Sequence, residues 1–265
     1  MSEPDFQPID RAVQTLPSIT LAEMDGVKLL NRIDTKYLTD ESTLVQVLSD
    51  AVAAGYRALE TEGTKISPYN SIYYDTDALE MFLEHHNRRL VRQKVRTRVY
   101  VNSGDAFLEI KRKNNHGRTK KKRTGIPLSE MGDFSCDEQA SAYLRKHSAY
   151  SAGQIFPVLS TGFRRITLVN PARTERLTID SRLEFENFRT GRKAFLGPAV
   201  IIELKQDGHL SSPMRGILLK YRVKPVRISK YCLAETLTDP GIKSNRFKTK
   251  VRAIEKVTRQ RIQVL

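Results

Sequence analysis

The sequence lacks several features that would place it in a familiar class of protein. It contains no tryptophan, and its two cysteines, Cys136 and Cys232, show neither metal-binding nor redox spacing. We therefore expect a reducing compartment and no disulfide framework. No apolar run approaches the roughly 18 residues that a membrane-spanning helix needs, and the stretch MSEPDFQPID has no signal-peptide core. These absences predict a soluble intracellular protein located in the cytoplasm.

The usual signatures of nucleotide binding and of nucleophilic catalysis are also missing. The chain has no glycine-rich phosphate loop and no G-K-[ST] motif. It shows no Ser/His/Asp or Cys/His constellation of the kind that activates a nucleophile. His85 and His86 end a predicted short helix and have no partners at metal spacing. None of these familiar signatures therefore identifies a function for the chain.

Positive charge is what the chain has in excess. Lysine and arginine number 45 against 30 aspartate and glutamate residues, which gives a formal net charge of +15 at pH 7. Such an excess indicates a polyanionic partner, whether nucleic acid, an anionic membrane or a phosphate compound. Composition does not choose among these three, so the arrangement of the charges along the chain has to decide.

The most unusual arrangement is the stretch LVRQKVRTRVY, residues 90–100. Arg92, Lys94, Arg96 and Arg98 occupy every second position, and mostly β-branched residues stand between them. A period of two predicts a strand with one apolar face and one fully cationic face. Four like charges along one strand repel each other unless an anion lies over them.

Similar alternation predicts further strands and an α+β fold. We expect about eight antiparallel strands, which either split into two layers or close into a barrel. Helices are predicted at residues 41–52, opened by Thr39-Asp40-Glu41, and at residues 78–86, capped by Asp75-Thr76-Asp77. Further helices are predicted within residues 18–30, at residues 128–150 and 211–221, and from residue 228 onward with Ser229 as the cap. Other predicted strands are residues 31–38, 56–60, 69–74, 106–113, 118–123, 157–169, 175–188 and 199–206.

The cationic faces could point outward into solvent, as is usual for an antiparallel sheet. Three observations favour the inward direction: the charges are not mixed in sign, the pattern recurs on several strands, and Glu203 interrupts an otherwise apolar strand. A closed β-barrel of about eight strands, with helices packed outside, would then enclose a basic tunnel. Such a tunnel suits a linear polyanion with a divalent metal ion, and phosphate chains fit best.

Short motifs recur in a fixed order along most of the chain, from about residue 31 to residue 234. Taken together, they resemble the vacuolar transporter chaperone (VTC) domain, the polyphosphate polymerase branch of the triphosphate tunnel metalloenzymes, a CYTH-like superfamily. They are T-K-Y (Thr35–Tyr37), S-I-Y-Y-D-T (Ser71–Thr76), R-x-R (Arg96, Arg98), E-x-K (Glu109, Lys111), aromatic-x-Arg (Phe163, Arg165), R-L-T-I-D (Arg176–Asp180), E-L-K (Glu203, Lys205) and S-K-Y (Ser229–Tyr231).

The resemblance implies an ATP-dependent polyphosphate polymerase, a metal-dependent phosphotransferase whose tunnel holds ATP and polyphosphate. Glu203 would be the ligand of Mn²⁺ or Mg²⁺. The catalytic phosphate contacts implied are Lys36, Arg96, Arg98, Lys111, Arg165 and Arg176. The further substrate-binding residues implied are Glu109, Lys120, Lys122, Lys205, Ser229 and Lys230.

Two points depart from the family pattern or leave it open. The superfamily's opening E-x-E-x-K is here Arg32-x-Asp34-x-Lys36, as expected for the polymerase branch rather than the hydrolases. Within KKKR, Lys122 shares a face with Lys120, and Lys121 would replace both after a one-residue slip in register. A non-catalytic binder of polyphosphate or triphosphate and a metal-dependent triphosphate hydrolase remain alternatives. A specific nucleic-acid partner is not expected, because stacking aromatic residues are not interleaved with the basic stripe.

We expect three parts along the chain. Residues 1–28 form an N-terminal segment that is helical in part, residues 29–240 form the VTC domain, and residues 241–265 form a basic helix or tail. The tail either contacts an anionic membrane, at the inner face, or packs on the barrel with a solvated basic face. The sequence carries no phosphate-sensing or transmembrane domain, so any translocation would belong to a membrane-protein partner.

Overall fold

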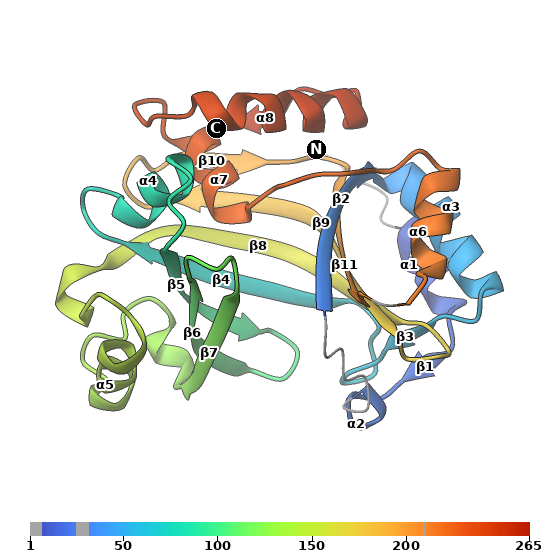
Figure 1. Ribbon diagram of the computed structural model, residues 1–265, viewed down its shortest axis with the longest axis horizontal. Helices are drawn as coiled ribbons and strands as arrows, with labels where there is room; N and C mark the ends of the chain where they lie inside the picture. The colour runs from blue at the N-terminus through green and yellow to red at the C-terminus, as the bar shows by residue number, and fades with distance from the viewer. Residues whose placement is uncertain (1–6, 25–31, 209) are drawn as a thin grey trace.

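The computed structural model describes residues 7–24, 32–208 and 210–265, and these form an α+β fold around one large sheet (Figure 1). The sheet has 13 strands within these residues. Its main path runs β12 (Lys224–Pro225), β2 (Arg32–Asp40), β11 (Ala199–Asp207), β9 (Glu175–Asn187), β8 (Phe156–Val169), β4 (Ser67–Asp75), β5 (Arg92–Tyr100), β6 (Asp105–Lys113) and β7 (Thr119–Ile126). The short strands β1 (Ser18–Ile19), β3 (Arg57–Leu59), β10 (Lys193–Phe195) and β13 (Gln263–Val264) lie off this path.

The prediction of a closed barrel is not confirmed, because the sheet is open. Its path ends at β7 on one side and at the two-residue strand β12 on the other, and the described strands include no pairing between them. The sheet nevertheless curls strongly. Lys111 on β6 lies within electrostatic range of Lys36 on β2 and Glu203 on β11, although four strands separate β6 from β11 in the sheet. The result is an open trough with a concave face.

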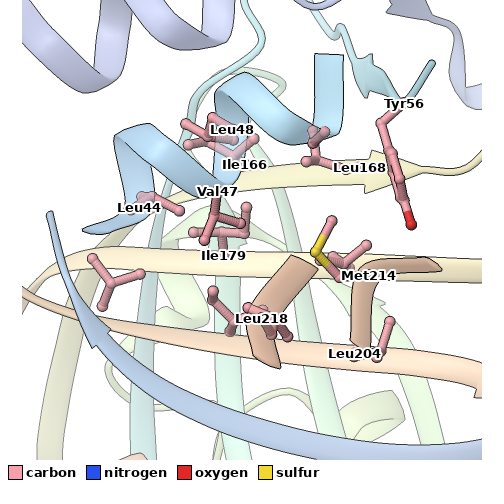
Figure 2. Packing of buried hydrophobic residues seen from close by; sticks show 14 of the residues in the cluster. Leu44, Val47, Leu48, Tyr56, Ile166, Leu168, Ile179, Leu204, Met214 and Leu218 are labelled. Carbon is pink, nitrogen blue, oxygen red and sulfur yellow. The ribbon is translucent and has the colours of Figure 1, made fainter. Parts of the chain in front are cut away.

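Helices cover the apolar, convex side of the sheet, as expected if the cationic faces of the strands point inward. α1 (Gln7–Gln14), α3 (Glu41–Ala53) and α6 (Pro213–Lys220) pack over the wing formed by β2, β11, β9 and β8. Figure 2 shows Leu44, Val47 and Leu48 of α3 against strand residues that include Ile166 and Ile179. Asp40 caps α3 by accepting a hydrogen bond from the Thr43 amide at 2.7 Å, as predicted.

The other wing has its own core beneath α5 (Glu138–His147). Val95, Leu108 and Ile110 of β5 and β6 pack there against Leu144 of α5. Residues 128–150 do not form the single helix expected from the sequence. A 3₁₀ turn (Leu128–Met131) comes first, and α5 begins only where Asp137 caps the Gln139 and Ala140 amides.

Three helices close one end of the trough. α4 (Glu80–His86), α7 (Lys230–Thr238) and α8 (Asn245–Thr258) share a core that includes Phe82, Tyr231, Cys232 and Ile254. α8 lies along this core through its apolar side, and its outer side exposes Arg246, Lys248, Arg252 and Lys256. The basic tail is thus a packed helix with a solvated basic face.

The N-terminal segment is only partly helical. Within residues 7–24 it contains α1, β1 and the four-residue helix α2 (Leu21–Met24), so the helix expected over residues 18–30 is much shorter in its described part. Residues 1–6 and 25–31 lie outside the described residues, and so does the first residue of the predicted strand at 31–38. No helix in the described ranges is long and apolar enough to cross a membrane.

Candidate functional site: a basic face with three carboxylates

Cationic side chains from eight elements, seven strands and the helix α7, gather on the concave side of the trough. Strand register places them together: Lys36 stands opposite Glu203, Lys205 opposite Arg176, and Lys94 opposite Lys111, which in turn faces Lys121. We call this surface the basic face. Its cations are Lys36, Lys94, Arg96, Arg98, Lys111, Lys121, Arg165, Arg176, Lys205 and Lys230.

Glu203 of β11 is a carboxylate of the basic face and lies between two lysines. Its Oε2 is 2.7 Å from Lys36 Nζ on the neighbouring strand, and its Oε1 contacts Lys205, two residues along its own strand. The Glu203 side chain keeps 23% of its surface exposed. Burial alone would raise the pKa of Glu203, but Lys205 and Lys36 hold it far below its usual range. Glu203 is therefore ionised and reachable from solvent.

Asp180 of β9 has a similar pair of cations but almost no exposure. Arg165 Nε and Nη2 donate to its two carboxylate oxygens at 2.6 and 2.8 Å, and Lys230 of α7 contacts Oδ2. Only 4% of the Asp180 side chain is exposed. Burial opposes ionisation, yet Arg165 and Lys230 lower the pKa of Asp180 strongly. The carboxylate thereby fixes an arginine of the sheet and the first residue of α7 in one place.

Glu109 of β6 completes the set. Arg96 Nε and Nη2 donate to Glu109 Oε2 at 2.8 and 2.6 Å, and Lys121 contacts the other oxygen. The Glu109 side chain is 2% exposed. Although burial raises the pKa of Glu109, Arg96 and its cationic neighbours lower it to about 2. Glu109 thus holds Arg96 in orientation rather than presenting a free oxygen.

Positive charge still exceeds negative charge on this face. Burial and the nearby Lys36 lower the pKa of Lys111 to about 8, against the opposing effect of Glu203. Burial, Arg96 and Arg165 lower the pKa of Arg98 to about 10. For Tyr73, burial raises the pKa, but Arg96 and Arg98 outweigh it and bring the pKa down to about 8. Each of these shifts indicates a region that would gain stability by binding an anion.

Aromatic rings support the arginines at the centre of the face. Tyr69 and Phe163 stack with centroids 5.5 Å apart. The Cζ of Arg98 lies 5.4 Å and 5.5 Å from these two ring centroids, and the Cζ of Arg165 lies at 5.0 Å and 5.1 Å. Arg98 Nε also donates to Ser71 Oγ at 2.9 Å. Cation–π contact of this kind restricts the guanidinium planes without using up their charge.

The N-terminus of α7 delivers the S-K-Y motif to the face. Ser229 caps the helix by accepting from the Cys232 amide, and its hydroxyl also accepts from Lys94 Nζ at 2.6 Å. Tyr231 donates its hydroxyl hydrogen bond to the buried Asp75, which also accepts from the Met81 and Phe82 amides of α4. The second and the last motifs of the resemblance, S-I-Y-Y-D-T and S-K-Y, are thus linked by this hydrogen bond.

The register of the β6–β7 hairpin overturns one placement. Lys122 stands opposite Ile110, and Lys120 opposite Arg112, so both point to the convex side. The expectation that they face the same surface as Lys111 is wrong, because Lys121 occupies that position and contacts Glu109. All residues of KKKR are cationic, so the two-residue period that identifies faces elsewhere carries no signal there.

A β-bulge directs the side chain of Arg182 away from the basic face. Strict alternation along β9 would place Arg182 on the same side as Arg176 and Asp180. The register between β8 and β9 shifts near Gly162, and Arg182 has a positive φ of 54°. Its side chain instead pairs with Glu41 at 3.0 Å, beside a cavity of about 420 Å³ on the helix-covered side. Alternation alone cannot predict such a break.

The structure adds residues that the resemblance did not name as site residues. Lys94 and Lys121 join the face through Ser229 and Glu109, and Tyr73 accepts a hydrogen bond from Arg96 Nη1 at 3.0 Å. For Lys94 the signal was present, because it alternates in step with Arg96 and Arg98. Every other implied site residue apart from Lys120 and Lys122 lies on the face or at its α7 end.

Of Glu203, Asp180 and Glu109, Glu203 fits the implied divalent metal ion best. In the described residues, no group of three or more His, Cys, Asp or Glu side chains comes together as a metal-binding cluster. Mg²⁺ is commonly held by one or two carboxylates plus substrate phosphates. Glu203 offers a hard, ionised, partly exposed oxygen donor, whereas the oxygens of Asp180 and Glu109 are buried in ion pairs.

Several solved structures resemble this chain at low sequence identity. Similar solved structures include a Vibrio parahaemolyticus protein described as an adenylate cyclase (9% identity, 76% of this chain and 96% of that chain, TM-score 0.45). Another is a Hippeastrum adenylyl cyclase described as having a dominant triphosphatase activity (18% identity, 77% and 95%, TM-score 0.46). A Pyrococcus horikoshii protein matches at 13% identity, 76% and 95%, with a TM-score of 0.43. No curated protein matches the chain.

The family assignment rests on the sequence match. The family model described as the VTC domain matches residues 31–237, which is most of the chain. The matched range begins with the strand that carries Lys36 and ends within α7, so it contains all the cations and carboxylates of the basic face. This chain belongs to the VTC domain family.

Proposed function

We propose that the protein is an ATP-dependent polyphosphate polymerase that transfers the γ-phosphoryl group of ATP to the end of a phosphate chain on the basic face. The observation that carries this proposal is the row of cations from β2 across the trough to β7, with a partly exposed carboxylate, Glu203, between Lys36 and Lys205. A linear polyanion is the ligand that such a row can neutralise along its length.

The arginines are suited to orient the phosphates. Arg98 and Arg165 are fixed by aromatic rings, and Arg96 is fixed by Glu109, so their guanidinium planes are set before substrate arrives. Preset donors spare the reorganisation that would otherwise oppose binding of the transition state. Arg176 stands opposite Lys205 and extends the row toward β11. Together these residues would hold the donor and acceptor phosphates in line.

The lysines are suited to neutralise charge where it develops. Lys36 and Lys111 approach from opposite wings of the trough, and Lys230 and Ser229 stand at its α7 end. A divalent cation bound at Glu203 with the nucleotide would add Lewis-acid neutralisation of the phosphate oxygens. The acceptor is an ionised phosphate, so no side chain need remove a proton. This requirement agrees with the lack of a nucleophile–base pair in the sequence.

The test is to incubate the purified protein with ATP and Mn²⁺ or Mg²⁺, with and without a short polyphosphate primer. We expect long-chain polyphosphate and ADP, and loss of both in Arg96→Ala. Lys248→Ala, on the outer side of α8, is the matched control and should retain full activity. Release of inorganic phosphate without polymer would identify a triphosphate hydrolase instead. Tight binding with no turnover of ATP would identify a non-catalytic binder.

Two further predictions concern what happens to the polyphosphate after it is made. Transfer to a membrane-protein partner, or contact of α8 with the inner face of an anionic membrane, remains a prediction from the basic tail. Co-sedimentation with vesicles containing anionic lipid, compared between the wild type and a variant with Lys248 and Arg252 changed to alanine, would test it. Equal sedimentation of the two proteins would contradict membrane contact through α8.

A further inference from the structure

The convex side of the β6–β7 hairpin carries its own cluster of cations. Arg112 and Lys120 stand directly opposite each other across the two strands, and Lys122 follows on the same side. All three are exposed, and so is Lys146 in the last turn of α5. We call these four residues the hairpin patch. It lies behind Lys111 and Lys121, on the other face of the same ribbon.

α5 packs against this hairpin and accounts for part of the patch. Arg112 Nη1 donates to the His147 carbonyl at 3.5 Å, at the C-terminal end of the helix, where a cation is favoured. Burial, Lys122 and Lys146 lower the pKa of the His147 side chain. The helix terminus therefore explains Arg112, but it gives no reason for the lysines beside it.

The patch differs from the basic face in having no carboxylates of its own. On the basic face, Glu203, Asp180 and Glu109 each lie between two cations. Across the ranges that the structure describes, no ion pair joins Arg112, Lys120, Lys122 or Lys146 to an acidic side chain. Like charges placed directly opposite on neighbouring strands destabilise a sheet. An anionic ligand over the patch would remove that cost.

The hairpin also connects the patch to the basic face. β7 is the last strand on its side of the sheet, so no further strand separates the two faces along this edge. Consecutive residues Lys120, Lys121 and Lys122 point alternately to the convex and concave sides. With a rise of about 3.3 Å per residue, a flexible polyanion leaving the face near Lys121 meets the patch at once.

We propose that the hairpin patch is a second phosphate-binding surface, which holds the part of a long polyphosphate chain that extends from the basic face around the edge of β7. This inference rests on the proposed function for the nature of the ligand. An unstructured phosphate chain suits the patch better than single-stranded nucleic acid does, because proteins that bind single strands stack the bases on exposed aromatic rings. Tyr143 of α5 is already engaged: its ring lies against that of His147, with centroids 4.5 Å apart, and its hydroxyl donates to the Arg123 carbonyl of β7.

The experiment compares a short and a long ligand in direct binding measurements. The variant is Lys120→Thr with Lys122→Thr, since threonine suits an exposed strand and leaves Arg112 at the end of α5. The control is Lys248→Ala with Arg252→Ala, which removes the same charge from the outer side of α8. Sodium tripolyphosphate reports on the basic face alone, and long-chain polyphosphate reports on both surfaces. Thermal melting confirms that all three proteins are folded.

For the double threonine variant, we expect long-chain affinity to fall about tenfold, with a salt dependence shallower by about one to two units. Tripolyphosphate affinity should stay unchanged, and the control variant should bind both ligands as the wild type does. The proposal is overturned if long-chain affinity is unaffected, if both ligands weaken equally, or if the control loses as much. It is also overturned if single-stranded RNA competes better than polyphosphate for the patch.

The readout separates this proposal from the proposed function. Binding is measured without ATP turnover, so a protein that makes no polymer can still show the length-dependent loss. Conversely, a polymerase that lacks any length-dependent loss would keep the proposed function and exclude the hairpin patch. Arg96→Ala, which should weaken both ligands, shows in the same assay that the short ligand reports on the basic face.

Discussion

Glu203 and Asp180 lie on neighbouring strands of the same face, and each contacts two cations, yet their surroundings differ. Asp180 is 4% exposed and its oxygens are occupied by a bidentate arginine and the first residue of α7. Glu203 is 23% exposed and contacts two flexible lysines. A lysine can move away from a carboxylate more easily than a stacked arginine fork can. Burial therefore separates a carboxylate that organises the protein from one that is open to a ligand.

The largest expected effect is a loss of stability when Asp180, the buried carboxylate, is removed. Asp180→Ala leaves Arg165 and Lys230 without their shared partner in a buried position, which costs about 3–5 kcal/mol of unfolding free energy. Chemical denaturation measures this loss. Glu203→Ala is the matched variant, and because its site is more exposed it should lose clearly less. Equal losses for the two variants would contradict the distinction between the carboxylates.

The next largest effect is a loss of turnover when Glu203, the partly exposed carboxylate, is neutralised. Glu203→Gln keeps the size of the side chain but removes the charge that would hold a metal ion. We expect metal-dependent turnover of ATP to fall about 100-fold, equivalent to about 2.7 kcal/mol in the transition state, while the melting temperature changes little. Steady-state kinetics with Mn²⁺ and Mg²⁺ would measure it. A variant with wild-type turnover would remove Glu203 as the metal ligand.

A smaller effect separates charge from geometry at Arg96. Arg96→Lys retains the positive charge but loses the fork that bonds to Glu109 and Tyr73. We expect kcat to fall about tenfold, or about 1.4 kcal/mol, with a smaller change in tripolyphosphate affinity. The same substitution at Arg246, on the outer side of α8, serves as the control. Loss confined to ligand affinity would mean that Arg96 supplies charge alone.

The smallest effect is a pH dependence of ligand binding. Lys111 has a pKa of about 8, and a bound phosphate favours its charged form. Below pH 8 the lysine is already protonated, so affinity is complete; above pH 8 binding requires proton uptake, so affinity falls. Tyr73, with a pKa also near 8, becomes anionic over the same range and acts in the same direction. Lys111→Arg should therefore make the fall in tripolyphosphate affinity above pH 8 less steep, and Tyr73→Phe should remove the rest of that fall. A pH profile that is the same in both variants as in the wild type would contradict these assignments.

Much of the site could be predicted from local pattern because a strand places alternate residues on one side. Arg96, Arg98 and Lys111 followed that rule, and Asp40 and Ser229 were recognisable as helix caps. The rule fails where its signal is uniform, as in KKKR, and where the backbone changes phase, as at Arg182. Closure of the sheet also escaped prediction, because it depends on whether the first and last strands meet. No local pattern contains that information.

The hydrogen bond from Tyr231 to Asp75 joins two sequence motifs that stand 156 residues apart. Asp75 also accepts from the first amides of α4, so one carboxylate fixes α4 and α7 together. In genetic terms the two motifs act as one unit. A substitution of either Asp75 or Tyr231 should release Lys230 and Ser229 from the basic face, so the two mutants should have the same phenotype. A double mutant should then be little worse than either single mutant, because S-I-Y-Y-D-T and S-K-Y serve the same structural role.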